Sequence, residues 1–97
     1  MTDDFSIERE DAGGHGRYVV HLPGELEAEM TFRKLGDTII AIDHTYVPPE
    51  FRSSGLALKL VERGIADARA GGIKVKPECS YVVAQFRRHP GWSDLLA

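Results

Sequence analysis

Hydrophobic and polar positions alternate along the first third of the chain and later change to a helical spacing. After a weakly alternating stretch at residues 5–10, which we expect to form an edge strand, a loose glycine-rich turn is expected at residues 11–16. A clear period of two then runs through residues 17–22 and 25–33. Its apolar members are Tyr18, Val20, Leu22, Leu26, Ala28, Met30 and Phe32. The pattern predicts a hairpin with one face in the core and one face in water.

Residues 38–47 have a different pattern, since every position in the run 39–42 is apolar. Continuous apolar runs are typical of strands covered on both faces, so we expect this strand to lie in the middle of a sheet. From near Glu50 the apolar spacing becomes about 3.6 residues, which predicts a helix that continues past Ile65 and ends at the glycine pair 71–72. Its apolar stripe consists of Ala57, Leu60, Val61, Gly64, Ile65 and Ala68.

Two shorter elements complete the pattern. Residues 73–75 are expected to form a strand parallel to 38–47, because a helix connects the two. A second helix is expected from residue 79 or 80 to Arg88. Its inward side chains are Val82, Val83 and Phe86. The order of elements predicts an α/β (α+β) fold: a mixed sheet of about five strands, four antiparallel and then one parallel, with two helices in one domain.

The strand-to-helix junction at residues 47–57 is the strongest candidate for a binding site. The first turn of a helix has N–H groups without intrahelical acceptors and a partial positive charge, so it can bind a phosphate. Gly55 lacks a Cβ and would let an oxyanion approach the backbone, while Arg52 offers a charged contact. Ser53 and Ser54 offer hydroxyl groups. We interpret the junction as a diphosphate cradle.

The same residues also have a purely structural interpretation. Prolines followed by an acid, as in Pro48, Pro49 and Glu50, are a common start of a helix, and Ser-Ser-Gly is common in turns. The junction alone does not decide between the two.

Composition and charge narrow the possible functions. The formal net charge of −3 favours neither nucleic acid nor an anionic membrane as a partner. Residues 1–4 are acidic and no apolar run is long, so we expect neither a signal peptide nor a membrane span. The lone cysteine, Cys79, fits a reducing compartment. We therefore expect a cytoplasmic protein, present as a monomer or a weak homodimer.

Several ordered motifs carry a family resemblance. They are His44-Thr45-Tyr46-Val47-Pro48, Arg52-x-x-Gly55-x-Ala57, Lys74-Val75-x-Pro77-x-Cys79-Ser80-Tyr81-Val82 and His89-Pro90-x-Trp92-x-Asp94-Leu95-Leu96. Together with the order of elements, these motifs resemble the GNAT superfamily of acyl-CoA-dependent N-acetyltransferases, in particular its minimal single-domain branch. The phosphate motif of that superfamily is matched at Arg52, Gly55 and Ala57.

The resemblance implies an acetyl-CoA-dependent acyltransferase that moves an acetyl group to an amine acceptor, either a small molecule or a protein. It implies that the strand before the phosphate motif and the strand after the first helix splay apart. The pantetheine arm of coenzyme A would pair with the former, at Thr45, Tyr46 and Val47. The implied cofactor-binding residues are Thr45, Tyr46, Val47, Arg52, Ser53, Ser54, Gly55, Leu56 and Ala57. Ser53 departs from the Arg-Gly pair that is more usual in this branch.

An alternative function remains open. The helical insertion that many relatives use for acceptor recognition has no counterpart between Glu10 and Gly16. This favours a non-catalytic acyl-CoA or nucleotide-binding module that acts through a protein partner.

Cys79 and His44 are the candidate catalytic residues. Cys79 is expected at a helix N-terminus, where the dipole favours a thiolate, so it could accept the acyl group or contact the thioester. A free cysteine is equally often a small buried apolar residue.

His44 could act as a general base, or it could be a structural histidine of the sheet. Strand alternation predicts that Asp43 points to the opposite face from His44, so the pair is not expected to act as a dyad.

The other polar and aromatic residues are expected to have structural roles. Glu27 and Glu29 are expected to be solvated on the wet face of the hairpin, and Trp92 is expected to be a packing anchor. The spacing of the histidines suggests no metal site.

Overall fold

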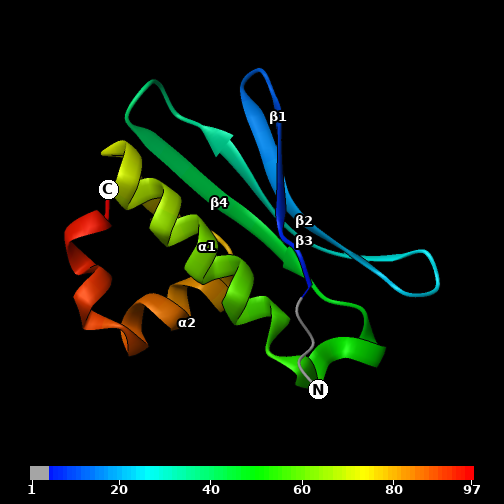
Figure 1. The fold of residues 1–97 in the computed structure, drawn as a ribbon. Helices are drawn as coiled ribbons and strands as arrows, with labels where there is room; N and C mark the ends of the chain where they lie inside the picture. Colours follow the sequence, from blue (N-terminus) through cyan, green and yellow to red (C-terminus); the bar gives the residue numbers. More distant parts are fainter. Residues whose placement is uncertain (1–4) are drawn as a thin grey trace.

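The computed structural model describes residues 5–97 and leaves the acidic residues 1–4 outside them. Its elements, in chain order, are β1 (Glu8–Ala12), β2 (His15–Leu22), β3 (Leu26–Lys34), β4 (Ile39–Tyr46), the 3₁₀ helix η1 (Pro49–Ser54), α1 (Leu56–Gly71), β5 (Lys74–Pro77), α2 (Ser80–Arg88) and the 3₁₀ helix η2 (Pro90–Leu95) (Figure 1). None of the helices in this part of the chain is long and apolar enough to cross a membrane.

The five strands form one sheet in the order β1-β2-β3-β4-β5, with β5 parallel to β4 and all other pairs antiparallel. This confirms the predicted fold class. The predicted turn at 11–16 is wrong, because Ala12 pairs with His15 and the turn contains only residues 13–14. Gly16 belongs to β2, where a Cβ would lie 2.6 Å from the carbonyl oxygen of Glu10 and 2.7 Å from the ring of Phe32. The glycine at this position therefore permits close packing inside a strand.

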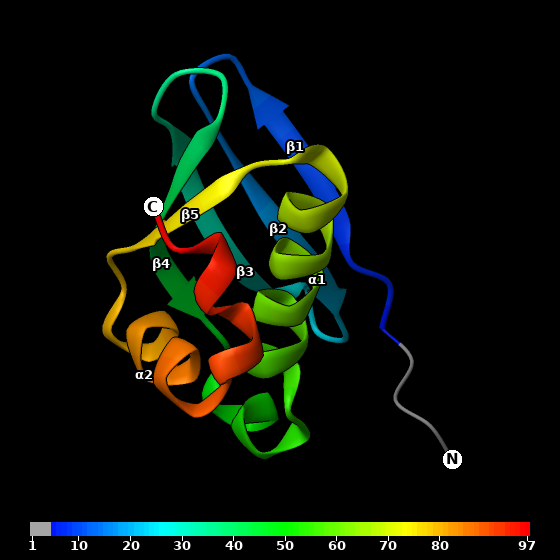
Figure 2. The same cartoon turned by 90° about the vertical axis from the view of Figure 1, so that its left-hand side faces the viewer.

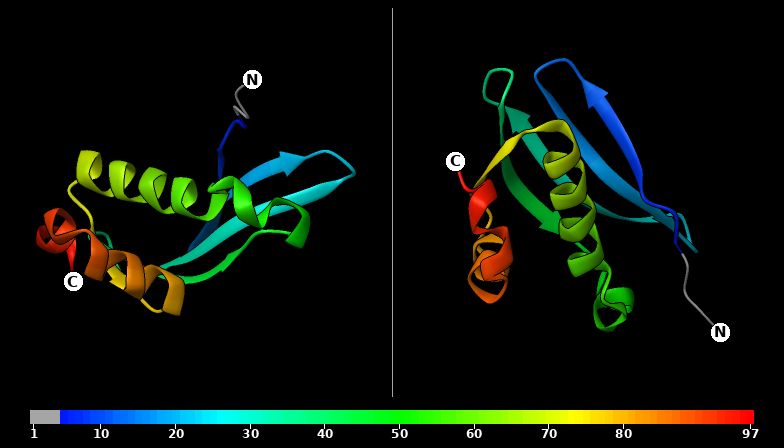
Figure 3. Two further views of the ribbon diagram at one scale, coloured as in Figure 1. Left: turned by 90° about the horizontal axis from the view of Figure 1, so that it is seen from below. Right: turned by 60° about the vertical axis from the view of Figure 1, so that its left-hand side comes forward.

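Helix α1 lies along one face of the sheet (Figure 3). The alternating apolar residues of β2 and β3 point toward this face and, apart from the half-buried Leu26, are buried, as the sequence pattern predicts. At Gly64 the helix comes so close to the strands that a Cβ would lie 2.8 Å from Cε of Met30. The opposite face of the sheet, which we call the open face, carries mostly polar side chains and a few buried small apolar residues such as Val19 and Ala41.

The predicted helix start near Glu50 is wrong. Residues 49–54 form the separate helix η1, and α1 begins at Leu56, after Gly55. Gly55 has a φ of 81°, in the left-handed region that glycine adopts without steric cost, so it ends one helix and precedes the next. The chain therefore makes a sharp corner at the predicted phosphate motif.

The C-terminal part of the chain packs beside α1 and next to β5 (Figure 2). Helix α2 has the predicted bounds, but it buries Gln85 together with Val82 and Phe86, while Val83 is only half-buried. Trp92 is the expected packing anchor: it packs edge-on against Phe86 and stacks on His89 with ring centroids 4.0 Å apart. The end of the chain runs along the outer edge of β5, where Ala97 N–H donates to the carbonyl of Val75.

Candidate functional site

Strand β4 has a closed half and a splayed half. Residues 40–42 pair with both β3 and β5, Ile39 pairs with β5, and the last register pair with β5 is Ile42 with Pro77. The amides of Glu78 and Cys79 both donate to the carbonyl of Ile42, and the chain then turns away into α2. Residues 44–46 pair with β3 only and Asp43 has no register partner, so the other edge of this segment faces no strand of residues 5–97.

A β-bulge lies at the point where the two halves meet. Thr31 pairs with His44 and Phe32 pairs with Ile42, which leaves Asp43 as an extra residue without a partner. Thr31 Oγ1 donates to Asp43, and Nη1 of Arg33 lies 3.2 Å from the same carboxylate, so Asp43 points to the face that also carries His44. The prediction that these two side chains point to opposite faces is therefore wrong, because a bulge places consecutive side chains on one side of a strand.

His44 is exposed on the open face, and the structure gives its side chain no hydrogen bond to residues 5–97. The carboxylate of its neighbour Asp43 is already occupied by Thr31 and Arg33. His44 therefore remains available to a ligand on that face, but it is not oriented by Asp43.

A groove of about 370 Å³ opens beside the splayed half of β4. Its walls are Thr45, Tyr46, Val47, Arg52, Ala57 and Tyr81, from β4, η1, α1 and α2. All of these except Tyr81 are among the residues that the sequence predicts to bind a cofactor. The structure thus brings the two predicted segments, 45–47 and 52–57, to one surface.

The first turn of α1 provides free backbone donors at one end of the groove. Its N-cap, Gly55, has no side chain to cap it, and the first helical bond is made by Lys59 N–H to the carbonyl of Gly55. Ser54 Oγ lies 3.4 Å from the amide of Leu56 and donates to the carbonyl of Phe51, so it blocks that amide only weakly. The missing Cβ of Gly55 would have no atom within 4 Å, so the backbone is open to a ligand there.

Arg52 makes an internal contact that the sequence did not suggest. Its Nε donates to the carbonyl of Val47 at 3.1 Å. This bond ties η1 to the end of β4 and uses one of the backbone acceptors at which a pantetheine arm was expected. The two Nη nitrogens form no ion pair with residues 5–97, and the side chain is exposed.

Cys79 is half-buried at the N-cap of α2, as predicted from the sequence. Its Sγ lies 3.7 Å from Thr45 Oγ1, across the opening between the two strands. The thiol also packs against the edge of the core. The thiol of Cys79 therefore contacts both the edge of the core and a residue of the groove.

Tyr81 is the groove residue that the sequence analysis did not single out, although it lies in one of the family motifs. It projects from the first turn of α2 into the groove. Burial raises the pKa of its hydroxyl above the usual value, so the group is protonated at neutral pH and can donate a hydrogen bond.

The open face carries a second and larger cavity of about 620 Å³, which we call the open-face cavity. It extends from the bulge of β4 across β3 and β2 to β1 and the β1–β2 turn. Arg17 is one of the side chains that line it. Its Nε lies 2.7 Å from Oε1 of Glu10, and its Nη1 lies 2.9 Å from Oε1 of Glu27 and 3.0 Å from Oε1 of Glu29. The prediction that Glu27 and Glu29 are simply solvated is therefore incomplete, because both carboxylates form ion pairs with the Arg17 guanidinium.

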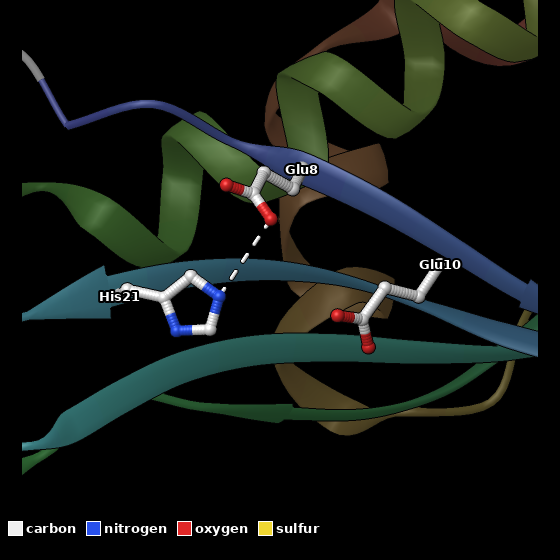
Figure 4. A group of neighbouring side chains, drawn as sticks. All are labelled: Glu8, Glu10 and His21. Atoms are coloured by element: carbon white, nitrogen blue, oxygen red, sulfur yellow. Dashed lines mark ion pairs between the residues drawn. The ribbon is translucent and has the colours of Figure 1, made fainter.

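A small acidic cluster lies at the β1 end of the open face. Glu8, Glu10 and His21 have side-chain ligand atoms within 4.8 Å of one another, and Glu8 Oε1 lies 3.6 Å from His21 Nε2 (Figure 4). All three are exposed, and Glu10 is also bound by Arg17. We treat the cluster as part of the ion-pair network and assign no ion to it.

Comparisons with known proteins agree with this architecture. An NMR structure of a GCN5-like candidate N-acetyltransferase from Staphylococcus aureus superimposes with a TM-score of 0.71 at 23% sequence identity, over 93% of this chain and 87% of that chain. At that identity the likeness shows the fold. The family model for GCN5-related N-acetyl-transferases matches residues 17–95. The chain belongs to the GCN5-related N-acetyltransferase family, as the sequence motifs indicated.

Proposed function

We propose that the protein is an acetyl-CoA-dependent N-acetyltransferase that moves an acetyl group to an amine. The observation that carries this proposal is the groove beside the splayed half of β4, which ends at the uncapped first turn of α1. Family membership supports the same reaction class.

The residues of the groove fit coenzyme A. A diphosphate would bind the amides of the first turn of α1, with the Nη groups of Arg52 nearby. A pantetheine arm would pair with the free edge of residues 45–46, since the carbonyl of Val47 already accepts from Arg52. The acyl end would then lie toward Cys79 and the bulge.

The reaction itself needs mainly alignment and proton transfer. An acetyl thioester supplies the acyl group; a C–N bond to the amine forms, the C–S bond breaks with its electron pair on sulfur, and the proton lost by the amine balances the thiol that is released. Tyr81 can donate a hydrogen bond into the groove. His44 is exposed on the open face, where it can take a proton from an incoming ammonium group.

Calorimetry and a thiol-release assay test this proposal together. We expect CoA and acetyl-CoA to bind, ATP to bind more weakly, and free thiol to appear only when acetyl-CoA and an amine are both present. Absence of CoA binding would overturn the proposal.

Substitutions at Gly55 test the cradle. Its φ of 81° means that a β-branched residue would also strain the backbone, so a bulky side chain would not separate binding from folding. Gly55→Asn is the better variant, because asparagine tolerates this conformation and still adds a side chain toward the ligand. We expect Gly55→Asn to weaken CoA binding about tenfold with little change in stability, whereas Gly72→Asn, which adds the same amide at the left-handed C-cap of α1, serves as a matched control.

A non-catalytic acyl-CoA-binding module is the second candidate. The direct β1–β2 turn at residues 13–14, which leaves no helical insertion for an acceptor, is the observation that favours it. CoA binding without thiol release for any amine would support this candidate over an enzyme.

A further inference from the structure

The 3₁₀ helix η1 carries Arg52 and leads into the first turn of α1, yet few contacts hold it in place. None of its six residues is buried. In the described part of the chain, its hydrogen bonds to other segments reach only Val47, Pro48 and Leu56, which are close to it in sequence. Of its side chains, Phe51 packs against the hydrophobic core. The orientation of η1 therefore depends on the contacts of Phe51.

Phe5 supplies one of these contacts from the segment that precedes β1. The rings of Phe5 and Phe51 pack edge to face, with centroids 6.1 Å apart and planes at 89°. Aromatic pairs favour this geometry, because the positive edge of one ring meets the negative face of the other. Phe5 is also half-buried against the core. The pair is thus a tertiary contact that joins the start of the described chain to η1.

Helix α1 fixes the path of this N-terminal segment, residues 5–7. Arg63 Nη1 donates to the carbonyl of Ile7 at 3.3 Å, while Nε of the same guanidinium pairs with Asp67 at 3.2 Å. The side chain of Ile7 packs against the core as well. In Figure 1 the chain leaves β1 toward the end of the molecule at which η1 lies. The N-terminal segment is therefore bonded to α1 at Ile7 and packs on η1 at Phe5.

We propose that Phe5 is a positioning residue for cofactor binding: by packing on Phe51, it holds η1 in the orientation in which Arg52 and the first-turn amides of α1 bind one diphosphate together. The proposal rests on the CoA binding proposed above and adds a residue that lies outside the groove and outside the family motifs. A site that is ordered before the ligand arrives loses less entropy on binding, so loss of the Phe5 ring should weaken the affinity for CoA.

Calorimetry with CoA tests this prediction. Phe5→Ala should raise the Kd for CoA about fivefold, as expected when an aromatic contact that orders the site is lost. Phe5→Tyr keeps the ring and should bind CoA like the wild type. Ile7→Ala is the matched control, because it truncates another core-packed side chain of the same segment, whose backbone is bonded to α1. It should lower stability and leave the Kd unchanged.

Two further measurements show whether Phe5 acts through η1. If the two rings work as one unit, the double variant Phe5→Ala/Phe51→Ala should bind CoA no more weakly than Phe51→Ala alone. Hydrogen exchange of the ligand-free protein gives a readout that does not depend on CoA: in Phe5→Ala the amides of residues 51–57 should exchange faster, and those of α2 should keep the wild-type rate. Thermal melts check folding, and Phe5→Leu replaces Phe5→Ala if that variant does not fold.

The outcomes separate this proposal from the proposed function. If the wild type binds CoA and Phe5→Ala binds it equally well, or if exchange at residues 51–57 is unchanged in Phe5→Ala, the role of Phe5 is overturned while the CoA site stands. Equal losses of affinity in Phe5→Ala and Ile7→Ala overturn it as well, because general destabilisation would explain both. Absence of CoA binding by the wild type overturns the proposed function itself.

Discussion

The two halves of β4 differ in almost every respect although they belong to one strand. Residues 40–42 are paired on both edges and their side chains are buried; residues 44–46 are paired on one edge and carry polar or half-exposed side chains. The first half holds the sheet and α1 together. The second half leaves backbone and side chains free at a groove. Stability and the proposed cofactor binding thus depend on consecutive segments of the same strand, so substitutions in the two halves should have different effects.

The largest effect is expected in the closed half. Ile42 is fully buried beneath α1, so Ile42→Ala should lower the free energy of unfolding by about 2–5 kcal/mol through lost contacts and a cavity. Urea denaturation measures this value. Thr45→Ala, in the splayed half, is the comparison and should cost about 1 kcal/mol or less. Similar losses for both variants would contradict the division of β4.

The groove can be blocked from the α1 side. Ala57→Phe should fill the space beside Val47 and Tyr81 and weaken acetyl-CoA binding about a hundredfold, or about 2.8 kcal/mol, with a smaller effect on folding. Calorimetry and thermal melts measure the two effects separately. Lys59→Phe adds the same ring at an exposed position of the same helix and should bind acetyl-CoA like the wild type.

Substitution of Cys79 tests the role of the thiol that lies at the opening between β4 and β5. Cys79→Ala removes the sulfur that lies beside Thr45, and we expect acetyl transfer to fall about tenfold while CoA binding changes less. Mass spectrometry of the wild type with acetyl-CoA alone shows whether an acetyl adduct forms. An adduct that is absent from Cys79→Ala would make Cys79 the nucleophile. Unchanged turnover in Cys79→Ala would reduce the thiol to a packing role.

The smallest effect is expected at the boundary between the halves. Hydrogen bonds from Arg33 hold the pKa of the Glu78 carboxyl below its usual value of 4.5, so the charged form is favoured in the folded state. This stabilisation is present at pH values above 4.5 and is lost as pH falls through the lowered pKa of the folded protein. Glu78→Gln should therefore lower the urea midpoint slightly at neutral pH, and the difference should vanish in acid. A difference that persists at low pH would show that packing is responsible.

Much of the fold followed from the spacing of apolar residues. The hairpin, the apolar run 39–42 and the stripe of α1 each predict a buried surface, and the structure confirms them. The start of α1 was misjudged, because Pro49 and Glu50 are equally suitable for a 3₁₀ turn, and the positive φ of Gly55 cannot be read from its identity alone.

The candidate site was harder to predict than the fold. The motif around Arg52 and Gly55 lies at the corner of the chain beside the groove, yet the bond from Arg52 to Val47 depends on how η1 folds back onto β4. The orientation of Asp43 was missed because a bulge has no reliable signal in a single sequence. The open-face cavity unites residues from four strands, and only the register of the sheet brings them together.

The extra residue at the bulge also makes β4 unusually tolerant of a change in length. Deleting one residue from an ordinary strand would turn every later side chain to the wrong face. Asp43 has no register partner on β3, so a chain without it could keep Thr45 on the same face of the sheet as Ile42 and His44 on the open face. Deletion of Asp43 would remove a carboxylate from the open face, while the side chains that follow would still point to the same faces of the sheet. A deletion therefore tests the role of the bulge more directly than a substitution.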